Sequence, residues 1–201
     1  MKTRISNTLF ILLATLVTLS GCTNHYKYKI GVSQCVGGRW REKANVEMLS
    51  AQHLYDNDVK VIIKNADNNN ERQCLQIDSL VDEGVDLLVV SPNDYHALNG
   101  SLQRAREKNI PIVFFDRTTA LKDYTAYIGG DNVEAGRKMA EYAAMLCRDS
   151  VKTDGRRPIV LEMTGPLAIS PAAQRHAGFS EVISKNPSID HRHVPSQWSY
   201  D

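Results

Sequence analysis

Short apolar runs separated by longer amphipathic stretches constrain the fold of this chain most. The runs at residues 59–64, 87–90 and 112–115 consist largely of apolar residues, and the run at 59–64 is typical of a strand buried on both faces of a parallel sheet. The stretches between them carry apolar residues at helical spacing, with Asn or Gly near several of their ends. Strand–helix alternation at this spacing predicts an α/β fold with parallel sheets covered on both faces.

The alternating pattern divides near Gly129-Gly130. About four strand–helix units precede this point and about two come after it, so we expect two Rossmann-like lobes over residues 28–130 and 131–201. The predicted helices span about 40–55, 71–83, 98–108, 131–147 and 171–185. The predicted strands span 28–32, 59–64, 87–90, 112–115, 126–128, 159–163 and 189–194.

The N-terminus has the pattern of an export signal, which predicts a signal peptide over residues 1–21. Lys2 and Arg4 precede an apolar run of about 11 residues, too short to span the ~30 Å hydrocarbon core of a bilayer. The sequence Leu19-Ser20-Gly21-Cys22 resembles the bacterial lipobox, in which the cysteine is acylated. We therefore expect a lipid at Cys22, a tether over residues 22–27 and a membrane-anchored lipoprotein in the periplasm. Cleavage without a lipid and an uncleaved signal anchor are the alternatives.

Composition excludes several classes of function. The chain has 24 basic and 23 acidic residues and no clustered Lys/Arg stripe, so we expect no nucleic-acid partner. Beyond Cys22 three cysteines remain, none in a CxxC pair, which argues against a disulfide framework. His191-Arg192-His193 has no third ligand nearby in sequence, so we expect no metal.

Catalysis and cofactor binding are not supported either. The turn after the first strand, residues 31–38, lacks the glycine spacing of a dinucleotide- or phosphate-binding loop. No nucleophile elbow accompanies Ser170, and His176 is expected to be a surface residue. We expect a binding domain without cofactor rather than an enzyme, an extracytoplasmic α/β enzyme being the alternative.

The ends of the predicted strands carry the residues most suited to a ligand, since ligands of open parallel sheets bind beyond the carboxyl ends. Asp116-Arg117 follows the fourth strand and places an acceptor beside a five-donor guanidinium. Arg175 offers a second guanidinium from the other lobe. Trp40 and Trp198 are the two tryptophans and fall near such ends. A sugar suits this set, because its hydroxyls both donate and accept and its C–H face packs on indole. An Asp116–Arg117 salt bridge within the loop and tryptophans packed in the core are the alternatives.

From residue 28 to residue 201 the chain resembles the periplasmic sugar-binding proteins of the ribose-binding type, which are related to the effector domains of LacI/GalR repressors. Six blocks carry the resemblance: Gly31-Val32-Ser33, residues 83–93, residues 109–113, Phe115-Asp116-Arg117, residues 128–132 and residues 175–179. Ser33-Gln34-Cys35 followed by Trp40-Arg41 is similar to the N-terminal sensor domains of Bacteroides-type hybrid two-component regulators.

The resemblance implies the type I periplasmic-binding-protein fold, which closes on a mono- or small saccharide between two lobes. The family's ligand contacts fall on Ser33, Trp40, Asp116, Arg117, Arg175 and Trp198. Arg39 and Gly37 stand where ribose binders carry an aromatic residue and an asparagine, so the ligand is not expected to be held as ribose is. The family fold also needs more chain than this, so we expect the second lobe to be incomplete.

The resemblance implies two roles. The first is the input domain of a hybrid two-component sensor, whose full-length parent carries a histidine kinase. The second is a lipid-anchored binding protein that delivers sugar to the permease of an ABC transporter. The ligand chemistry is the same in both roles, and only the downstream partner differs.

Overall fold

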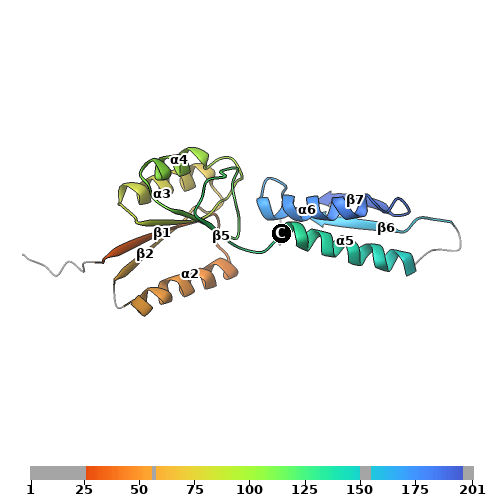
Figure 1. Cartoon of the computed structure of the whole chain (residues 1–201), viewed down its shortest axis with the longest axis horizontal. Helices are drawn as coiled ribbons and strands as arrows, with labels where there is room; N and C mark the ends of the chain where they lie inside the picture. Colours follow the sequence, from red (N-terminus) through yellow and green to blue (C-terminus); the bar gives the residue numbers. More distant parts are fainter. Residues whose placement is uncertain (1–25, 56–57, 150–154, 197–201) are drawn as a thin grey trace, which may run out of the picture.

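The computed structural model describes residues 26–55, 58–149 and 155–196, which form two α/β units arranged one after the other (Figure 1). The first unit contains β1 (Tyr28–Gln34), α2 (Arg39–Ala51), the 3-10 turn η1 (Gln52–Tyr55), β2 (Val59–Asn65), α3 (Asn70–Asp82), β3 (Leu87–Ser91), α4 (Asn99–Glu107), β4 (Ile112–Phe115) and β5 (Ala126–Ile128). The second contains α5 (Asn132–Asp149), β6 (Ile159–Thr164), α6 (Ser170–Ile183) and β7 (Asp190–Pro195). The predicted helices and strands occur in the predicted order, and the α/β class is confirmed.

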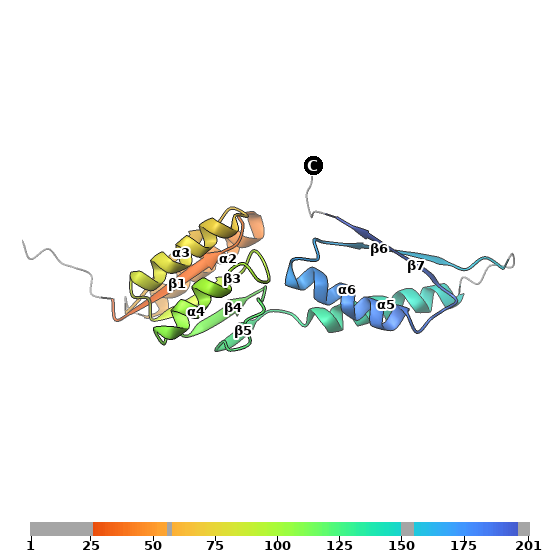
Figure 2. The same ribbon diagram turned by 90° about the horizontal axis from the view of Figure 1, so that it is seen from above.

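The first unit is built on a five-stranded sheet with the order β2-β1-β3-β4-β5. Every neighbouring pair is parallel, and Val32 of β1 lies opposite Ile63 of β2 and Val89 of β3. Because all the strands run in one direction, their carboxyl ends meet at a single edge of the sheet. Figures 1 and 2 show that this edge faces the second unit.

Helices cover both faces of the five-stranded sheet, with α3 and α4 on one face and α2 on the other (Figure 1). The main core lies between the sheet and the α3–α4 pair. Its fully buried members include Ile77, Leu80, Leu88, Leu102 and Phe114. The apolar run of β2 was predicted to be buried on both faces, but most of its residues are only half-buried. The reason is its position at the edge of the sheet, where it has a neighbour on one side only.

The second unit has a two-stranded parallel sheet, β6-β7, with α5 and α6 on one face (Figure 2). Alternate residues of β6 face opposite ways. Val160 packs on the core formed by the two helices, whereas Leu161 and Met163 are exposed. Coverage on both faces, predicted for parallel sheets in general, therefore holds for the first sheet and not for these two strands. Among the described residues, no helix combines the length and apolarity that crossing a bilayer requires.

Helices α5 and α6 pack through two glycines that meet the partner helix's backbone. A Cβ placed on Gly136 would overlap the carbonyl oxygen of Arg175, and one on Gly178 would overlap the carbonyl oxygen of Val133. Backbone atoms cannot swing aside as a side chain can, so the close approach requires glycine at both positions.

We expect Gly178→Ala to destabilise the second unit by about 1–3 kcal/mol, because the added methyl group must push α6 away from α5. Urea unfolding followed by circular dichroism measures the effect. Gly100→Ala in α4 is the matched control, since its Cβ would come no nearer than 3.6 Å to the Arg104 side chain. That control should be neutral or slightly stabilising. An unchanged unfolding midpoint for Gly178→Ala would contradict this account of the packing.

Candidate functional site

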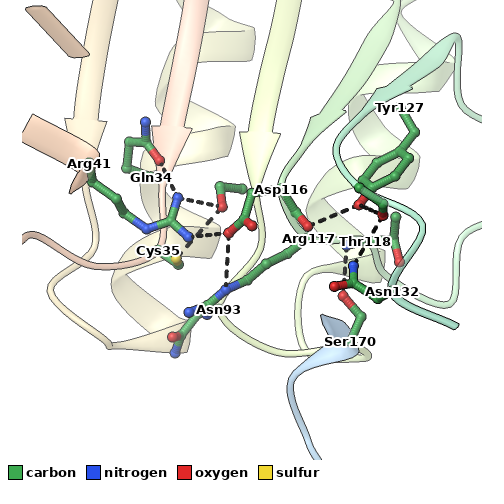
Figure 3. A network of polar contacts seen from close by, with 12 residues as sticks. Gln34, Cys35, Arg41, Asn93, Asp116, Arg117, Thr118, Tyr127, Asn132 and Ser170 are labelled. Carbon is green, nitrogen blue, oxygen red and sulfur yellow. Dashed lines mark hydrogen bonds and ion pairs between the residues drawn. The ribbon is translucent and has the colours of Figure 1, made fainter. Parts of the chain in front are cut away.

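A buried arginine ties together three strand ends of the first sheet. Arg41 lies in the first turn of α2, and its side chain is 6% exposed. Its Nη1 donates to Gln34 Oε1 at 2.9 Å and to Ser91 Oγ at 2.8 Å, at the ends of β1 and β3. Its Nη2 donates to Asp116 Oδ2 at 2.7 Å, directly after β4 (Figure 3). One guanidinium therefore sets the relative positions of polar groups on three strands.

Asp116 has an unusual backbone conformation that aims its side chain at this network. Its φ angle is 64°, in the left-handed region, which non-glycine residues rarely adopt. The Arg117 N–H donates to the Phe115 carbonyl at 2.7 Å, so Asp116 is the central residue of a γ-turn with positive φ, a rare and strained turn. The turn is held by the Asp116 N–H bond to the Ile128 carbonyl at 2.8 Å. The Tyr127 hydroxyl adds a bond to the Asp116 carbonyl at 3.1 Å. Strain that the surroundings hold in place is typical of functional sites.

Arg117 is a second buried guanidinium at the same strand end, and it is incompletely paired. Its side chain is 10% exposed, and its Nη1 has no hydrogen-bond partner among the described residues. Its Nε lies 3.8 Å from Asp116 Oδ2, too far for a hydrogen bond. Burial lowers the pKa of Arg117 below its ordinary value; Arg41 lowers it further, while Cys35 and Asp116 oppose the shift. A buried donor without an acceptor is costly, and an acceptor brought by a ligand would satisfy it.

Trp40 provides an exposed aromatic surface next to the polar network. Its ring is stacked on Phe115, with the centroids 5.6 Å apart and the planes at 10°. The Arg41 guanidinium carbon lies 5.1 Å from the centre of the Trp40 ring. The residue is 58% exposed, so the structure does not place Trp40 in the core. An exposed indole beside buried polar groups is the arrangement expected where a ligand has one apolar face and several polar edges.

Ser33 lies behind the strand ends rather than beside Asp116. It is fully buried, and its hydroxyl accepts from Gln73 Nε2 at 3.1 Å. Gln73, on α3, also donates to the Ser91 carbonyl at 2.9 Å and accepts from the Asn93 N–H at 2.9 Å. No sequence signal pointed to Gln73, because a buried glutamine on an amphipathic helix looks like any polar position. Ser33 and Gln73 thus form a supporting layer beneath the site.

Arg175 is the one predicted site residue that the structure describes on the second unit. It lies in the first half of α6 and is exposed. Burial and the negative charge of Asp116 raise the pKa of the Tyr127 hydroxyl. The positive charge of Arg175 partly opposes this shift. Trp198, also predicted from the sequence, lies outside the described residues.

The closest ionic partner of Asp116 is Arg41 rather than its neighbour in sequence. The Arg41–Asp116 distance is 2.7 Å, against 3.8 Å for the Asp116–Arg117 pair expected within the loop. Sequence reasoning noted Trp40-Arg41 as a block but did not assign Arg41 to the site. The sequence feature that could have indicated Arg41 is its place in the first turn of the helix that starts after Gly37-Gly38, soon after the end of the first strand.

Metal binding has no support in the part of the chain that the structure describes. No group of three or more His, Cys, Asp or Glu side chains there is arranged to hold an ion. The histidines of β7 have other partners. His191 Nε2 lies 2.9 Å from Glu162 Oε2, and His193 Nε2 lies 2.8 Å from Thr164 Oγ1.

Comparison with known proteins gives a family match over most of the chain. The model of the periplasmic binding protein domain matches residues 30–201. The ribose import binding protein of Bacillus subtilis is 29% identical over 131 residues, which is 65% of this chain and 41% of that protein. The D-xylose-binding periplasmic protein of Escherichia coli is 27% identical over 140 residues, 69% of this chain and 42% of that protein.

Solved structures give the same picture. The fructose-binding periplasmic domain of a hybrid two-component system superposes with a TM-score of 0.74 at 36% identity, over 87% of this chain and 55% of that one. A Mycobacterium smegmatis protein in complex with β-D-fucofuranose superposes with a TM-score of 0.73 at 25% identity, over 86% and 56%. The chain thus spans about two fifths of the curated relatives, and about half of the solved ones.

We expect Arg117→Met to stabilise the protein without ligand by about 1–3 kcal/mol, because it removes a buried donor that has no acceptor while keeping the packing of the stem. Thermal unfolding measures the change. Arg104→Met is the control, since Arg104 forms a surface pair with Asp78 whose loss should change stability by less than about 1 kcal/mol. Marked destabilisation by Arg117→Met would show that the guanidinium is already satisfied.

Proposed function

The chain belongs to the periplasmic binding protein family, and we propose that it is a periplasmic carbohydrate-binding domain that closes on a mono- or small saccharide. The observation that carries the proposal is the unpaired Nη1 of buried Arg117 beside the carboxylate of Asp116, next to the exposed ring of Trp40. A sugar supplies the partners that these three groups lack. One hydroxyl donates to the carboxylate, another oxygen accepts from the guanidinium, and an apolar ring face covers the indole.

The names of the relatives agree with this chemistry. They are described as binding ribose, xylose and fructose, all small neutral sugars. Polar groups dominate the described site, and a sugar satisfies both donors and acceptors without bringing a net charge. We therefore propose Trp40, Asp116 and Arg117 as direct contacts from the first unit, with Ser33 supporting them from beneath.

The proposed site also includes contacts from the second unit. We propose Arg175, on α6, as a further contact, and Trp198 as another on the basis of the sequence. The two units already touch, since the Thr118 N–H donates to Ser170 Oγ at 2.9 Å at the start of α6 (Figure 3). A ligand held by both units favours the state in which they are close together, and a receptor or a transporter responds to this difference in affinity.

We favour a sensor role over transport. The supporting observation is the 36% identity to a domain of a hybrid two-component system, together with the Ser33-Gln34-Cys35 and Trp40-Arg41 blocks. The alternative, a substrate-binding protein of a sugar ABC transporter, is supported by the 29% identity to a ribose import protein. The two roles differ in the protein to which the binding domain passes its signal or its sugar. A membrane helix and a histidine kinase encoded after Asp201 would identify the sensor, and a separate permease gene the transporter.

Thermal unfolding of the full-length protein against D-ribose, D-xylose and D-fructose tests the binding proposal. A sugar at about 100 times its Kd should stabilise the protein by about 2.7 kcal/mol and raise the melting temperature visibly. Asp116→Asn should weaken binding at least about tenfold, because the ligand loses a charged acceptor. Asp78→Asn, which changes a partly exposed carboxylate outside the site, should bind as the wild type does. Absence of a shift with every sugar in a folded sample would refute the proposal.

We also propose that Cys22 carries a lipid that anchors the protein to the membrane. Several acyl chains anchor stably where one does not, since each buried CH₂ contributes about 0.8 kcal/mol. Cells fed an alkyne-bearing fatty acid should label the wild type, and Cys22→Ser should abolish the label and release the protein from the membrane fraction. Cys147→Ser, on α5, should remain labelled. Label retained in Cys22→Ser would show that the cysteine is not the attachment point.

A further inference from the structure

Arg41 differs from the other charged groups at the site because its hydrogen bonds are made within the protein. Its two terminal nitrogens bond Gln34, Ser91 and Asp116 at 2.7–2.9 Å, and its side chain is almost completely buried. It is not among the ligand contacts that the family resemblance implies. A buried guanidinium is expensive unless fully paired, so its presence at a strand end needs a reason other than packing.

We propose that Arg41 is a positioning residue that determines how Asp116 meets the sugar. By holding Oδ2, it fixes the carboxylate plane and leaves Oδ1 as the oxygen presented to the ligand. The inference rests on the proposed function, since it concerns the same site. It adds a specificity element that is set from α2 rather than by a residue in contact with the sugar.

The distances around the carboxylate support this division of the two oxygens. Asp116 Oδ2 lies 2.7 Å from Arg41 Nη2 and 3.8 Å from Arg117 Nε, so both guanidinium groups approach the same oxygen. No described residue makes a hydrogen bond to Oδ1. An unrestrained carboxylate can rotate and offer either oxygen to a diol. With Oδ2 held, Asp116 presents Oδ1 in a fixed direction beside the unpaired Nη1 of Arg117.

Arg41 is itself held rigidly, which gives the positioning its accuracy. Its acceptor Gln34 donates in turn to Asn45 Oδ1 at 2.7 Å, one helical turn further along α2. Its acceptor Ser91 is fixed at the end of β3, where the Gln73 side chain bonds the Ser91 carbonyl at 2.9 Å. The position of the Asp116 carboxylate is thereby fixed relative to β1, β3 and α2. Groups held in the bound geometry beforehand lose less entropy when the ligand arrives.

The same helical turn also carries the aromatic surface. Trp40 precedes Arg41, and the guanidinium lies 5.1 Å from the indole centre, within the range of a cation–π contact. Trp40 is stacked in turn on Phe115, the residue before Asp116. Arg41 therefore contacts both the indole and the carboxylate, and it fixes the distance and the angle between them. A ligand must match both at once, with its apolar face and one hydroxyl in a fixed relation.

Variants of Arg41 in the full-length protein test the proposal with the sugar of the ribose, xylose and fructose panel that binds most tightly. Arg41→Met should weaken binding about 10- to 100-fold, because Asp116 loses the charged hydrogen bond that orients it. Arg41→Lys should recover part of the loss, since it restores the charge but not the planar fork that serves three acceptors. Arg104→Met, which removes a surface arginine–aspartate pair, should leave the affinity unchanged.

A double-mutant cycle with Asp116→Asn separates positioning from a general effect on the fold. If Arg41 acts through Asp116, Arg41→Met should cost less than about threefold in affinity when Asp116 is already changed. A merely structural role would lower the affinity equally in both backgrounds, and that result would overturn the proposal. Melting-temperature shifts at several sugar concentrations report the weak affinities that the cycle needs. The ligand-free melting temperatures show which variants remain folded.

The other possible results distinguish a failure of the role proposed for Arg41 from a failure of the proposed function. Wild-type affinity in Arg41→Met, with a loss in Asp116→Asn, would overturn the role of Arg41 and leave the sugar site intact. Failure of the wild type to bind any sugar of the panel would refute the proposed function itself, and the inference would fall with it. Strong coupling in the cycle together with partial rescue by Arg41→Lys is the result expected.

Discussion

The buried positive charge of Arg41 is the constraint on which the binding edge of the first unit depends. A guanidinium taken out of water must be surrounded by acceptors, and three strand ends supply them. This requirement explains why polar residues end β1 and β3 and why the chain turns sharply after β4. The γ-turn at Asp116, with its φ of 64°, brings the carboxylate within 2.7 Å of Arg41 Nη2. The hydrophobic core does not depend on this network, since it lies between the sheet and the α3–α4 pair.

The site is destabilising by itself, and the hydrophobic core of the first unit offsets its cost. A strained turn and an unpaired Arg117 Nη1 each cost on the order of 1–3 kcal/mol. Against them stands a continuous cluster that contains Leu88 of β3 and Phe114 of β4, both completely buried. Phe114 and Asp116 are two residues apart, so one short segment contributes both to the core and to the site. Rigid strands that hold strained, incompletely paired groups are what a preorganised binding site requires.

How much of this the sequence predicts depends on the range of the interaction. Periodicity and turn residues are local, so they predicted the order of helices and strands, the parallel α/β class and, through the resemblance, the type I periplasmic-binding-protein fold. Asp116, Arg117 and Trp40 were proposed as candidates because they stand at or near strand ends, where position alone suggests a ligand contact. Arg41 and Gln73 were missed because their roles depend on reaching residues 75 and 18 positions away, respectively. The half-burial of β2 was missed because an apolar run does not reveal the order of strands in the sheet, and hence which strand lies at its edge.

The two units contribute unequally to the proposed recognition, and this inequality has a consequence for signalling. In the proposed site the first unit supplies a carboxylate, a guanidinium and an indole, so it would make most of the contacts to a sugar before the units approach each other. Of the second unit, the described candidate is Arg175, an exposed side chain on α6. A ligand shifts the balance between open and closed states only by the affinity it gains from the second unit. Affinity would then be set mainly around Asp116, whereas the strength of the conformational response would depend on the contacts that α6 adds. Two sugars with equal affinity for the first unit can therefore differ in the signal they produce.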